Sequence, residues 1–314
     1  MRNVLVLTLM LLLFAAASAA PRMALVKVAA ACLRSQPAHS SELETQATYG
    51  TPLEITESSG EWHKAVLPDG YSAWITASAI TPLTDSEFAE WRKAPRLIVT
   101  APLPTVAYAD SLNEAVDNVA FDVVLGAIFE GVLKPGARFA EIVTPDGRHG
   151  FITVTDVADF AEWAVRPESL TAVMDAADSM NGVTYLWGGT TPKALDCSGF
   201  TKVCYGASGL ILPRNASQQA LVGRKLDVNR PETFRRGDLL FFGNGEGKKI
   251  THVGIYEGNG QYIHSSGRVF RSSFDSGNPL YLPRKVIAAC RILGDENRVG
   301  ISDYRNHQWY FSKD

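Results

Sequence analysis

A duplicated segment constrains the fold of the first half of the chain more than any other feature of the sequence. Residues 68–76 (PDGYSAWIT) match residues 145–153 (PDGRHGFIT) at an offset of 77 (145 − 68), and Trp62 matches Phe139 at the same offset. Within each Pro-Asp-Gly, Pro presets φ and Gly accepts a positive φ, so the tripeptide forms a turn. Aromatic and apolar residues flank each turn, and each copy therefore predicts a β-hairpin.

The duplication extends beyond the hairpins. Residues 88–91 (FAEW) recur as residues 160–163, and a stretch with three prolines, 95–104, marks the join between the copies. Each copy resembles the small all-β barrels of bacterial SH3-type domains. The resemblance implies two such barrels, at residues 20–94 and 95–165, and tandem copies most often bind a wall polymer.

The N-terminal residues 1–19 predict an export signal. Arg2 supplies a positive charge, an apolar run from Val4 to Ala17 follows, and small residues precede an expected cleavage before Ala20. The run is short for a membrane span, and no cysteine directly follows it as a lipoprotein would require. We therefore expect an exported protein, periplasmic or extracellular and associated with the cell wall, with no stable membrane anchor after cleavage.

Composition excludes some classes of function. The chain has 314 residues, 46% of them hydrophobic and 20% charged, with a net charge of −3. These values are typical of a globular protein with sizeable cores. No basic stripe points to nucleic acid as a partner. The length predicts two or three domains, and we place the third at residues 166–314.

The second half of the chain is organised around residues 196–200 (DCSGF). Asp196 is expected to cap a short helix, which places Cys197 in its first turn. The backbone N–H groups and the helix dipole favour a thiolate there. A nucleophilic cysteine also needs a base, for which His252 and His264 are candidates. The alternative is that Cys197 is a buried structural thiol.

The spacing of the two histidines predicts a pair. His252 and His264 are twelve residues apart (264 − 252) and symmetric about Gly258, in two expected strands joined by a hairpin. Directly opposed residues have Cβ atoms about 4.5–5.5 Å apart, so one imidazole can hydrogen-bond the other. We expect His252 to take the thiol proton, His264 to orient it, and a thiolate–imidazolium pair at neutral pH. A packed pair, or a zinc site completed by Cys197, is the alternative.

The four cysteines show no C-x-x-C pair, which argues against zinc. Cys197 and Cys204 are two helical turns apart, too far for a disulfide. A bond between Cys32 and Cys290 stays open. We expect a reactive Cys197, otherwise buried thiols, and no metal or cofactor.

Hydrophobic periodicity predicts the remaining elements of the third domain. A helix is expected over residues 169–180, and strands over 239–242, 252–256, 261–264 and 286–292. The last twenty residues, which include Trp309, Tyr310 and Phe311, are expected to pack on another domain.

Five segments of this domain together resemble the NlpC-type cell-wall cysteine peptidases, a papain-like bacterial family. They are 185–189 (YLWGG), 196–200 (DCSGF), 236–242 (RGDLLFF), 252–256 (HVGIY) and His264. The resemblance spans about residues 168–292. It implies an α+β papain-like peptidase domain preceded by the two SH3-like barrels, with Cys197, His252 and His264 as catalytic residues.

The resemblance also implies roles beside the nucleophile. The Tyr185 hydroxyl is expected to join the Cys197 backbone N–H in stabilising the oxyanion. Asp196 and Ser198 are expected to hold the peptide stem of the substrate. Trp187 is expected to line the cleft, with core packing as the alternative.

The whole arrangement resembles the γ-D-glutamyl-L-diamino-acid endopeptidases (dipeptidyl-peptidase VI), which cut muropeptides that carry a free N-terminal L-Ala. Peptidoglycan stem peptides or muropeptides are thus the expected partners. Glu42 and Tyr71 of the first barrel are candidates to hold the L-Ala ammonium, because an unpaired cation in a partly closed site is costly. An ordinary solvated Glu and a packed strand Tyr are the alternatives.

Two further activities stay open: a wall-binding protein with an inactive peptidase-like domain, and a thiol acyltransferase. One departure from the family pattern concerns the substrate. Asn215 and Ala216 stand where similar proteins often carry Asp and Ser, so a charge and a hydroxyl near the cleft are lost.

Overall fold

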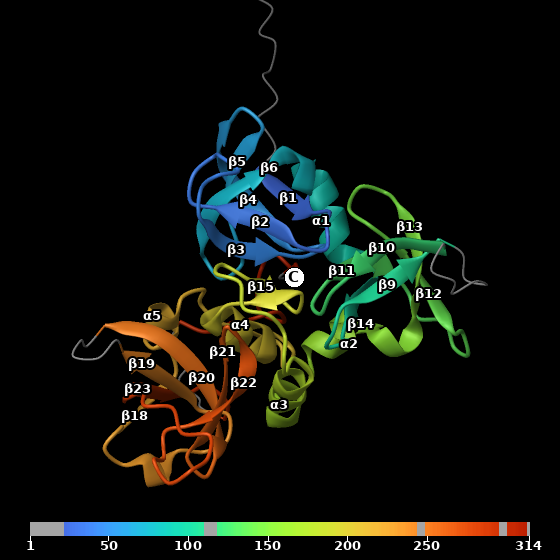
Figure 1. Ribbon diagram of the computed structural model, residues 1–314. Coiled ribbons are helices and arrows are strands. Elements are labelled where there is room, and N and C mark those ends of the chain that lie inside the picture. Colours follow the sequence, from blue (N-terminus) through green and yellow to red (C-terminus); the bar gives the residue numbers. More distant parts are fainter. Residues whose placement is uncertain (1–21, 110–117, 244–248, 295–299, 313–314) are drawn as a thin grey trace, which may run out of the picture.

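The computed structural model describes residues 22–109, 118–243, 249–294 and 300–312, so the expected export signal lies outside the described residues. The described chain folds into three units that meet near its C-terminal end (Figure 1). No helix in these ranges is long and apolar enough to cross a membrane.

The first unit is a seven-stranded antiparallel sheet. Its strands are β1 (Met23–Val26), β2 (Ala31–Arg34), β3 (Leu43–Ala47), β4 (Pro52–Ser59), β5 (Trp62–Val66), β6 (Ser72–Thr76) and β7 (Ile80–Leu83), in the order β3-β2-β6-β5-β4-β1-β7. Alternate side chains point inward and form a core of small and branched residues that includes Leu33, Leu53 and Ile75. A 3₁₀ turn (Ala77–Ala79) precedes β7, and α1 (Asp85–Lys93) follows it.

The second unit repeats the first. Its strands are β8 (Arg96–Val99), β9 (Thr105–Tyr108), β10 (Val119–Val123), β11 (Ile128–Gly131), β12 (Phe139–Val143), β13 (His149–Thr153) and β14 (Val157–Asp159), in the order β10-β9-β13-β12-β11-β8-β14. Each strand number is seven higher than its counterpart in the first sheet, and the β5–β6 and β12–β13 hairpins carry the duplicated turns. The predicted repeat is confirmed. The proline-rich join is not all linker, because it contains β8.

The repeated Phe-Ala-Glu-Trp segments lie on two short helices, α1 and α2 (Phe160–Ala164). Thr84 and Glu87 form a capping box at the start of α1, and Asp159 caps α2. The Phe and Trp side chains of both helices share one buried cluster with Tyr310. The C-terminal segment therefore packs on the first two units, as predicted.

The third unit is a six-stranded sheet with helices on it. The strands are β18 (Arg224–Leu226), β19 (Leu239–Gly243), β20 (Ile250–Gly258), β21 (Gln261–Ser266), β22 (Arg268–Ser273) and β23 (Val286–Arg291), in the order β18-β23-β19-β20-β21-β22. The helices are α3 (Leu170–Ser179), α4 (Cys197–Gly206) and α5 (Ala216–Gln219). The two-stranded pairs are β15 (Thr190–Thr191) with β16 (Ala194–Leu195), and β17 (Leu210–Ile211) with β24 (Ser302–Asp303). The predicted helix and four predicted strands are present, whereas β18 and β22 were not expected.

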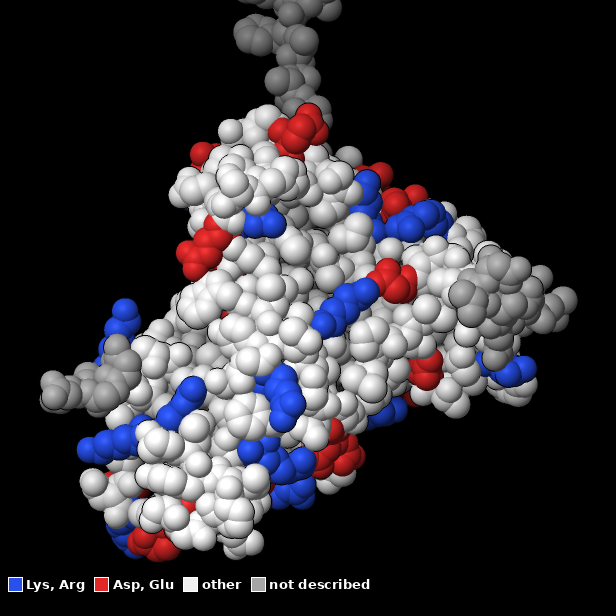
Figure 2. Space-filling view, viewed as in Figure 1, with Lys and Arg blue, Asp and Glu red and all other residues white. Residues whose placement is uncertain are grey.

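The first unit lies directly against the third, where β3 runs beside β15 (Figure 1). The Gln46 backbone N–H donates to Thr190 Oγ1 at 2.9 Å, and the Thr190 N–H donates to Gln46 Oε1 at 3.0 Å. A Cβ on Gly188 would lie 2.4 Å from the Leu43 carbonyl oxygen, and its φ is +81°, so this close approach requires glycine. Figure 2 shows small separate groups of both charges on this side, with Lys and Arg more frequent over the third unit.

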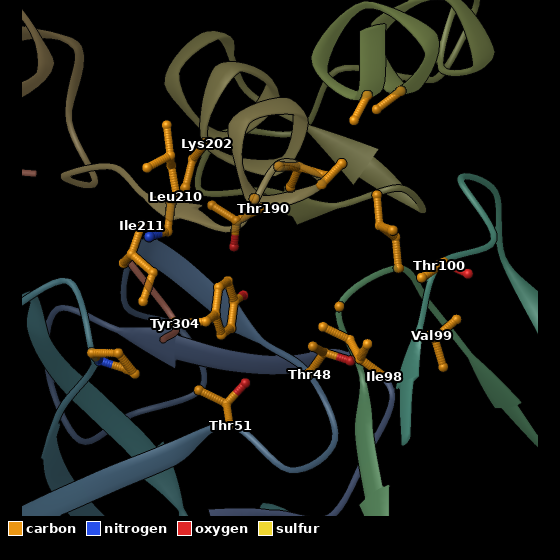
Figure 3. A pocket seen from close by; sticks show the side chains of 18 of the residues that line it. Thr48, Thr51, Ile98, Val99, Thr100, Thr190, Lys202, Leu210, Ile211 and Tyr304 are labelled. Carbon is orange, nitrogen blue, oxygen red and sulfur yellow. The ribbon is translucent and has the colours of Figure 1, made fainter. Parts of the chain in front are cut away.

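A cavity of about 400 Å³ lies where the three units meet. Side chains of all three units point into it (Figure 3), among them Thr48 and Thr51, Ile98 and Thr100, and Lys202 and Leu210. Neither Cys197 nor His252 lines this cavity. It lies instead on the side of α4 that carries Lys202 and Val203.

Candidate active site

Asp196 organises the start of α4. Its Oδ1 accepts the Gly199 N–H at 2.7 Å, which is the predicted N-cap. Its Oδ2 accepts the Gly188 N–H at 3.0 Å, so the same carboxylate holds the glycine-rich loop. Ser198 Oγ also donates to Oδ1, at 3.2 Å. With this many donors, Asp196 serves first to hold the nucleophile helix in place.

Arg214 completes the network, although the sequence did not mark it as a site residue. Its Nη1 donates to Asp196 Oδ1 at 3.2 Å and to Ser198 Oγ at 3.0 Å, and its Nη2 donates to Asp196 Oδ2. Its Nε donates to the Glu44 carbonyl oxygen at 2.9 Å. Arg214 and Asp196 are both buried, and breaking such a pair costs about 3–5 kcal/mol. The pair therefore ties β3 of the first unit to the nucleophile helix.

Cys197 is the first residue of α4 and faces a second cavity, of about 500 Å³. The cavity is lined by Tyr185, Cys197, Phe242, Gly243, Thr251, His252, Ser266, Gly267 and Arg284. The predicted nucleophile, Cys197, and the predicted base, His252, thus line the same cavity. The Cys197 side chain is not fully enclosed, since 8% of the residue is exposed.

His252 on β20 and His264 on β21 contact each other, as predicted. Nε2 of His252 and Nδ1 of His264 are 2.6 Å apart. The predicted direct opposition is wrong, because Ile255 pairs with Ile263. In that register His264 lies beside Gly254, whose ideal Cβ position is 3.1 Å from the His264 Cβ. The two imidazoles therefore meet diagonally, across a residue that has no side chain.

The turn and an irregularity in the ladder together explain the shifted register. Asn259 has φ 51° and Gly260 has φ 73°, so both central residues of the hairpin are left-handed. A hairpin centred on this Asn-Gly turn pairs Gly258 with Gln261 and would place His264 opposite Ile255. The irregularity between Tyr256 and Gly258 shifts the pairing by one residue, which brings His264 beside Gly254.

Ser272 extends the chain of hydrogen bonds beyond His264. Nε2 of His264 is 3.0 Å from Ser272 Oγ on β22, and both residues are buried. A neutral imidazole has one N–H and one acceptor nitrogen. When His264 donates to Ser272, its Nδ1 accepts the Nε2–H of His252, and Nδ1 of His252 carries no proton. Ser272 lies on an unpredicted strand, and nothing in its local sequence indicates this role.

Burial raises the pKa of the Cys197 thiol to about 11, and the Asp196 carboxylate adds to this effect. Burial, followed by the nearby His264 and Arg284, lowers the pKa of His252 well below its ordinary value. Desolvation penalises both charged forms. The free protein therefore favours a neutral thiol beside a neutral imidazole, and the predicted thiolate–imidazolium pair is corrected accordingly.

This protonation state predicts a broad pH range of activity. A base must be neutral to accept a proton, and the pKa of His252 is lowered from 6.5. We expect kcat/KM to be constant from pH 6.5 until the Cys197 thiol begins to ionise, below the midpoint of its titration at about pH 11, and to fall on the acid side only below pH 6.5. Circular dichroism at each pH separates this loss from acid unfolding. An acid limb centred at or above pH 6.5 would contradict the lowered pKa.

Of the two aromatic residues of the loop before α4, Tyr185 lines the cavity around Cys197 and Trp187 does not. Burial, with the nearby Cys197 second, raises the Tyr185 pKa to about 12. Its hydroxyl therefore keeps its proton and can donate. Trp187 is 61% exposed, which excludes core packing.

The first unit places Tyr71 and Glu44, not Glu42, together near this site. Tyr71 donates a hydrogen bond to the Glu44 carboxylate, and burial, with Glu44 second, raises the Tyr71 pKa to about 12. Asn215 and Arg214 also act on this hydroxyl. Glu42 is exposed, and within the described ranges its side chain has no hydrogen bond or ion pair. Glu42 and Glu44 both have the period-two spacing of Gln46, so alternation alone does not separate them. The strand β3 begins at Leu43, and of the two only Glu44 lies in it.

All four cysteines are in described segments, and each is free. The expectation of buried thiols is correct for Cys204 and Cys290 but wrong for Cys32, which is exposed. Cys32 lies on β2 of the first unit, whereas Cys290 is buried in β23 of the third, so the two are not bonded.

Comparison with known proteins places these features in a class. Residues 182–286 match the NlpC/P60 family, and residues 33–80 match the bacterial dipeptidyl-peptidase SH3 domain. The fold and the buried Cys–His site define a cysteine peptidase with two N-terminal SH3-like units. The third unit thus contains an NlpC/P60 domain, and the first contains a domain similar to the bacterial dipeptidyl-peptidase SH3 domain.

Individual relatives cover most of the chain. The gamma-D-glutamyl-L-lysine dipeptidyl-peptidase of Bacillus cereus is 26% identical over 237 residues, which is 72% of this chain and 68% of the relative. The Bacillus subtilis protein of the same name is 28% identical over 236 residues, 71% of this chain and 72% of that protein. A crystal structure of an NlpC/P60 family protein from Bacillus cereus superposes with a TM-score of 0.73 at 23% identity, over 86% of this chain and 99% of that chain. That structure shares the fold of all three units.

Proposed function

We propose that the protein is an exported cysteine peptidase that hydrolyses the bond between γ-D-Glu and the diamino acid in peptidoglycan stem peptides with a free N-terminal L-Ala. The observation that carries this proposal is the position of Glu44 and Tyr71, which the first unit brings to Arg214 and the nucleophile helix. The names of the two Bacillus relatives support it. Residues 1–19 act as the export signal, and residues 20–94, 95–165 and 166–314 form the three domains.

The reaction begins with Cys197. Its Sγ attacks the carbonyl carbon of the γ-glutamyl amide while Nδ1 of His252 takes the thiol proton. The Cys197 backbone N–H at the start of α4 and the Tyr185 hydroxyl donate to the oxyanion. The protonated His252 then gives its proton to the leaving amine, and a thioester forms. Water, activated by His252, hydrolyses the thioester and releases the dipeptide.

His264 and Ser272 act on the base. The Nε2–H of His252 donates to Nδ1 of His264 across 2.6 Å, which keeps Nδ1 of His252 free for the thiol. Ser272 accepts from Nε2 of His264 across 3.0 Å and so fixes its tautomer. Because these contacts are buried, they also stabilise the imidazolium that forms during attack. With both of its nitrogens engaged, His264 is a poor candidate for a metal ligand.

The first unit forms the end of the cleft that receives the substrate amine. The L-Ala ammonium can pair with the Glu44 carboxylate, beside the Tyr71 hydroxyl. The Asn215 side chain contacts the same hydroxyl. Residue 215 therefore still contributes here, although as an amide rather than the carboxylate of similar proteins. An acylated amine has no charge to offer and is bulkier, so glycan-attached stems are poor substrates.

Glu44→Gln is expected to lower kcat/KM for L-Ala-γ-D-Glu-L-Lys roughly ten- to a hundredfold, because a charge-assisted hydrogen bond is worth about 1.5–3 kcal/mol. Glu42→Gln is the matched control, two residues away and exposed, and should behave as wild type. The N-acetylated tripeptide should be a poor substrate for the wild type and for both variants. If the wild type cuts free and acetylated peptides equally well, the first unit does not select the amine.

Defined muropeptides test the function itself. We expect mass spectrometry to show L-Ala-γ-D-Glu and the free remainder as products from tripeptides and tetrapeptides. Wall binding without turnover would indicate an inactive peptidase-like domain instead. Products carrying a second amine in place of water would indicate an acyltransferase.

A further inference from the structure

Arg284 lines the active-site cavity together with Cys197 and His252. All residues that line the cavity around Cys197 and His252 belong to the third unit, and neither Glu44 nor Tyr71 is among them. If the substrate amine is held by the first unit, this cavity lies on the opposite side of the nucleophile. It is therefore where the leaving half of the substrate must sit.

Arg284 has room for an anion. Its Nη2 donates to Ser266 Oγ at 3.2 Å, and among the described residues no carboxylate forms an ion pair with it. Three other arginines of the third unit are paired: Arg214 with Asp196, Arg271 with Glu257 and Asp178, and Arg291 with Asp238. Arg284 is also half-buried, and a partly desolvated cation without a counter-charge favours an anionic ligand.

The position of Arg284 relative to the reacting atoms also supports an anionic ligand at this arginine. Its charge contributes to the lowered pKa of both His252 and His264, so it lies close to the histidine pair. His252 is the group that delivers a proton to the leaving amine. In an amino acid the α-carboxylate carbon is two bonds from the amine nitrogen, so the carboxylate of an amine beside this histidine falls within reach of Arg284.

We propose that Arg284 binds a carboxylate of the diamino acid that leaves, and so selects stem peptides with an anionic group just after the scissile bond. This proposal rests on the function proposed above. The carboxylate has two sources: the C-terminal α-carboxylate of a tripeptide, or the side-chain carboxylate of a diaminodicarboxylic acid. Arg284 can form two parallel hydrogen bonds to either.

The test compares four substrates of the full-length enzyme. They are L-Ala-γ-D-Glu-L-Lys, its C-terminal amide, the corresponding meso-diaminopimelate tripeptide, and that tripeptide amidated only at its α-carboxylate. The lysine amide has neither carboxylate, so the wild type should cleave it roughly tenfold or more slowly than the peptide that keeps the bound carboxylate, which is the lysine acid or the α-amidated diaminopimelate peptide. Retained activity on the α-amidated diaminopimelate peptide identifies the side-chain carboxylate as the ligand, and lost activity identifies the α-carboxylate.

Arg284→Gln should remove the preference for a carboxylate, mainly through KM, and leave the amide substrate within about threefold of wild type. Lys285→Gln is the matched control, since Lys285 is the adjacent exposed cation, and it should keep the preference. If the wild type cleaves the lysine amide as fast as the three peptides that keep a carboxylate, the role of Arg284 alone is overturned. An equal loss on every substrate in Arg284→Gln also overturns it, since that result shows a general effect on the histidines. Cleavage of none of the four overturns the proposed function as well.

Discussion

Cys197→Ala is expected to abolish turnover of stem tripeptides, by roughly 10⁴-fold or more, while the protein stays folded. No neighbouring group can replace the thiol, because Cys204 and Cys290 are buried elsewhere in the third unit. The substitution removes one atom that borders a cavity, so it should cost little stability. The measurement is kcat/KM on L-Ala-γ-D-Glu-L-Lys beside a thermal melt. Activity within about tenfold of wild type would refute the assignment of the nucleophile.

An affinity label separates an active enzyme from an inert wall-binding protein. Cys32 is exposed and free, so it is open to thiol reagents. The label is therefore tested on a Cys32→Ser variant, which removes this background reaction. The raised pKa of Cys197 makes it a slow target for simple alkylating agents at neutral pH. An L-Ala-γ-D-Glu peptide with a thiol-reactive end should nevertheless label Cys197 selectively, because the cleft positions it. Labelling of Cys32→Ser but not of Cys32→Ser/Cys197→Ala is the expected result.

His252→Ala should cost about 10²- to 10⁴-fold in kcat, because general-base catalysis contributes that much. His264→Ala should cost roughly tenfold less, since His252 still reaches the thiol without its orienting partner. His264→Asn keeps an acceptor for the Nε2–H of His252 and should recover part of the loss. Ser272→Ala should give a smaller loss of the same kind. If His264→Ala proves more damaging than His252→Ala, the two roles are reversed.

Local structure was predictable from the sequence because periodicity and turn chemistry encode it. The duplicated Pro-Asp-Gly turns gave both hairpins, and the Asp196 cap gave the start of the nucleophile helix. The register of the histidine hairpin was wrong because Gly258 was taken as its centre in place of the Asn259-Gly260 turn, and because the irregularity between Tyr256 and Gly258 was not expected.

The residues missed at the site were missed for two reasons. Arg214 and Glu44 act through contacts between segments far apart in the chain, for which a single sequence carries no pattern. Ser272 is only eight residues from His264, but it lies on β22, a strand that was not predicted. The protonation state of Cys197 and His252 was mispredicted because it depends on how deeply the two side chains are buried. The helix dipole that favours a thiolate is visible in the sequence, whereas the burial of Cys197 and His252 is a property of the folded unit.

The aromatic cluster that joins the two Phe-Ala-Glu-Trp helices to the C-terminal segment has a consequence for biosynthesis. Tyr310 completes this cluster, the Arg96 guanidinium donates to the Tyr310 carbonyl oxygen at 2.8 Å, and His307 donates to the Pro68 carbonyl at 3.0 Å. Each unit has its own core, but the seam between the first two is sealed by residues translated after the catalytic unit. During vectorial synthesis the first two units therefore reach their final packing against each other only after residues 307–310 have been translated.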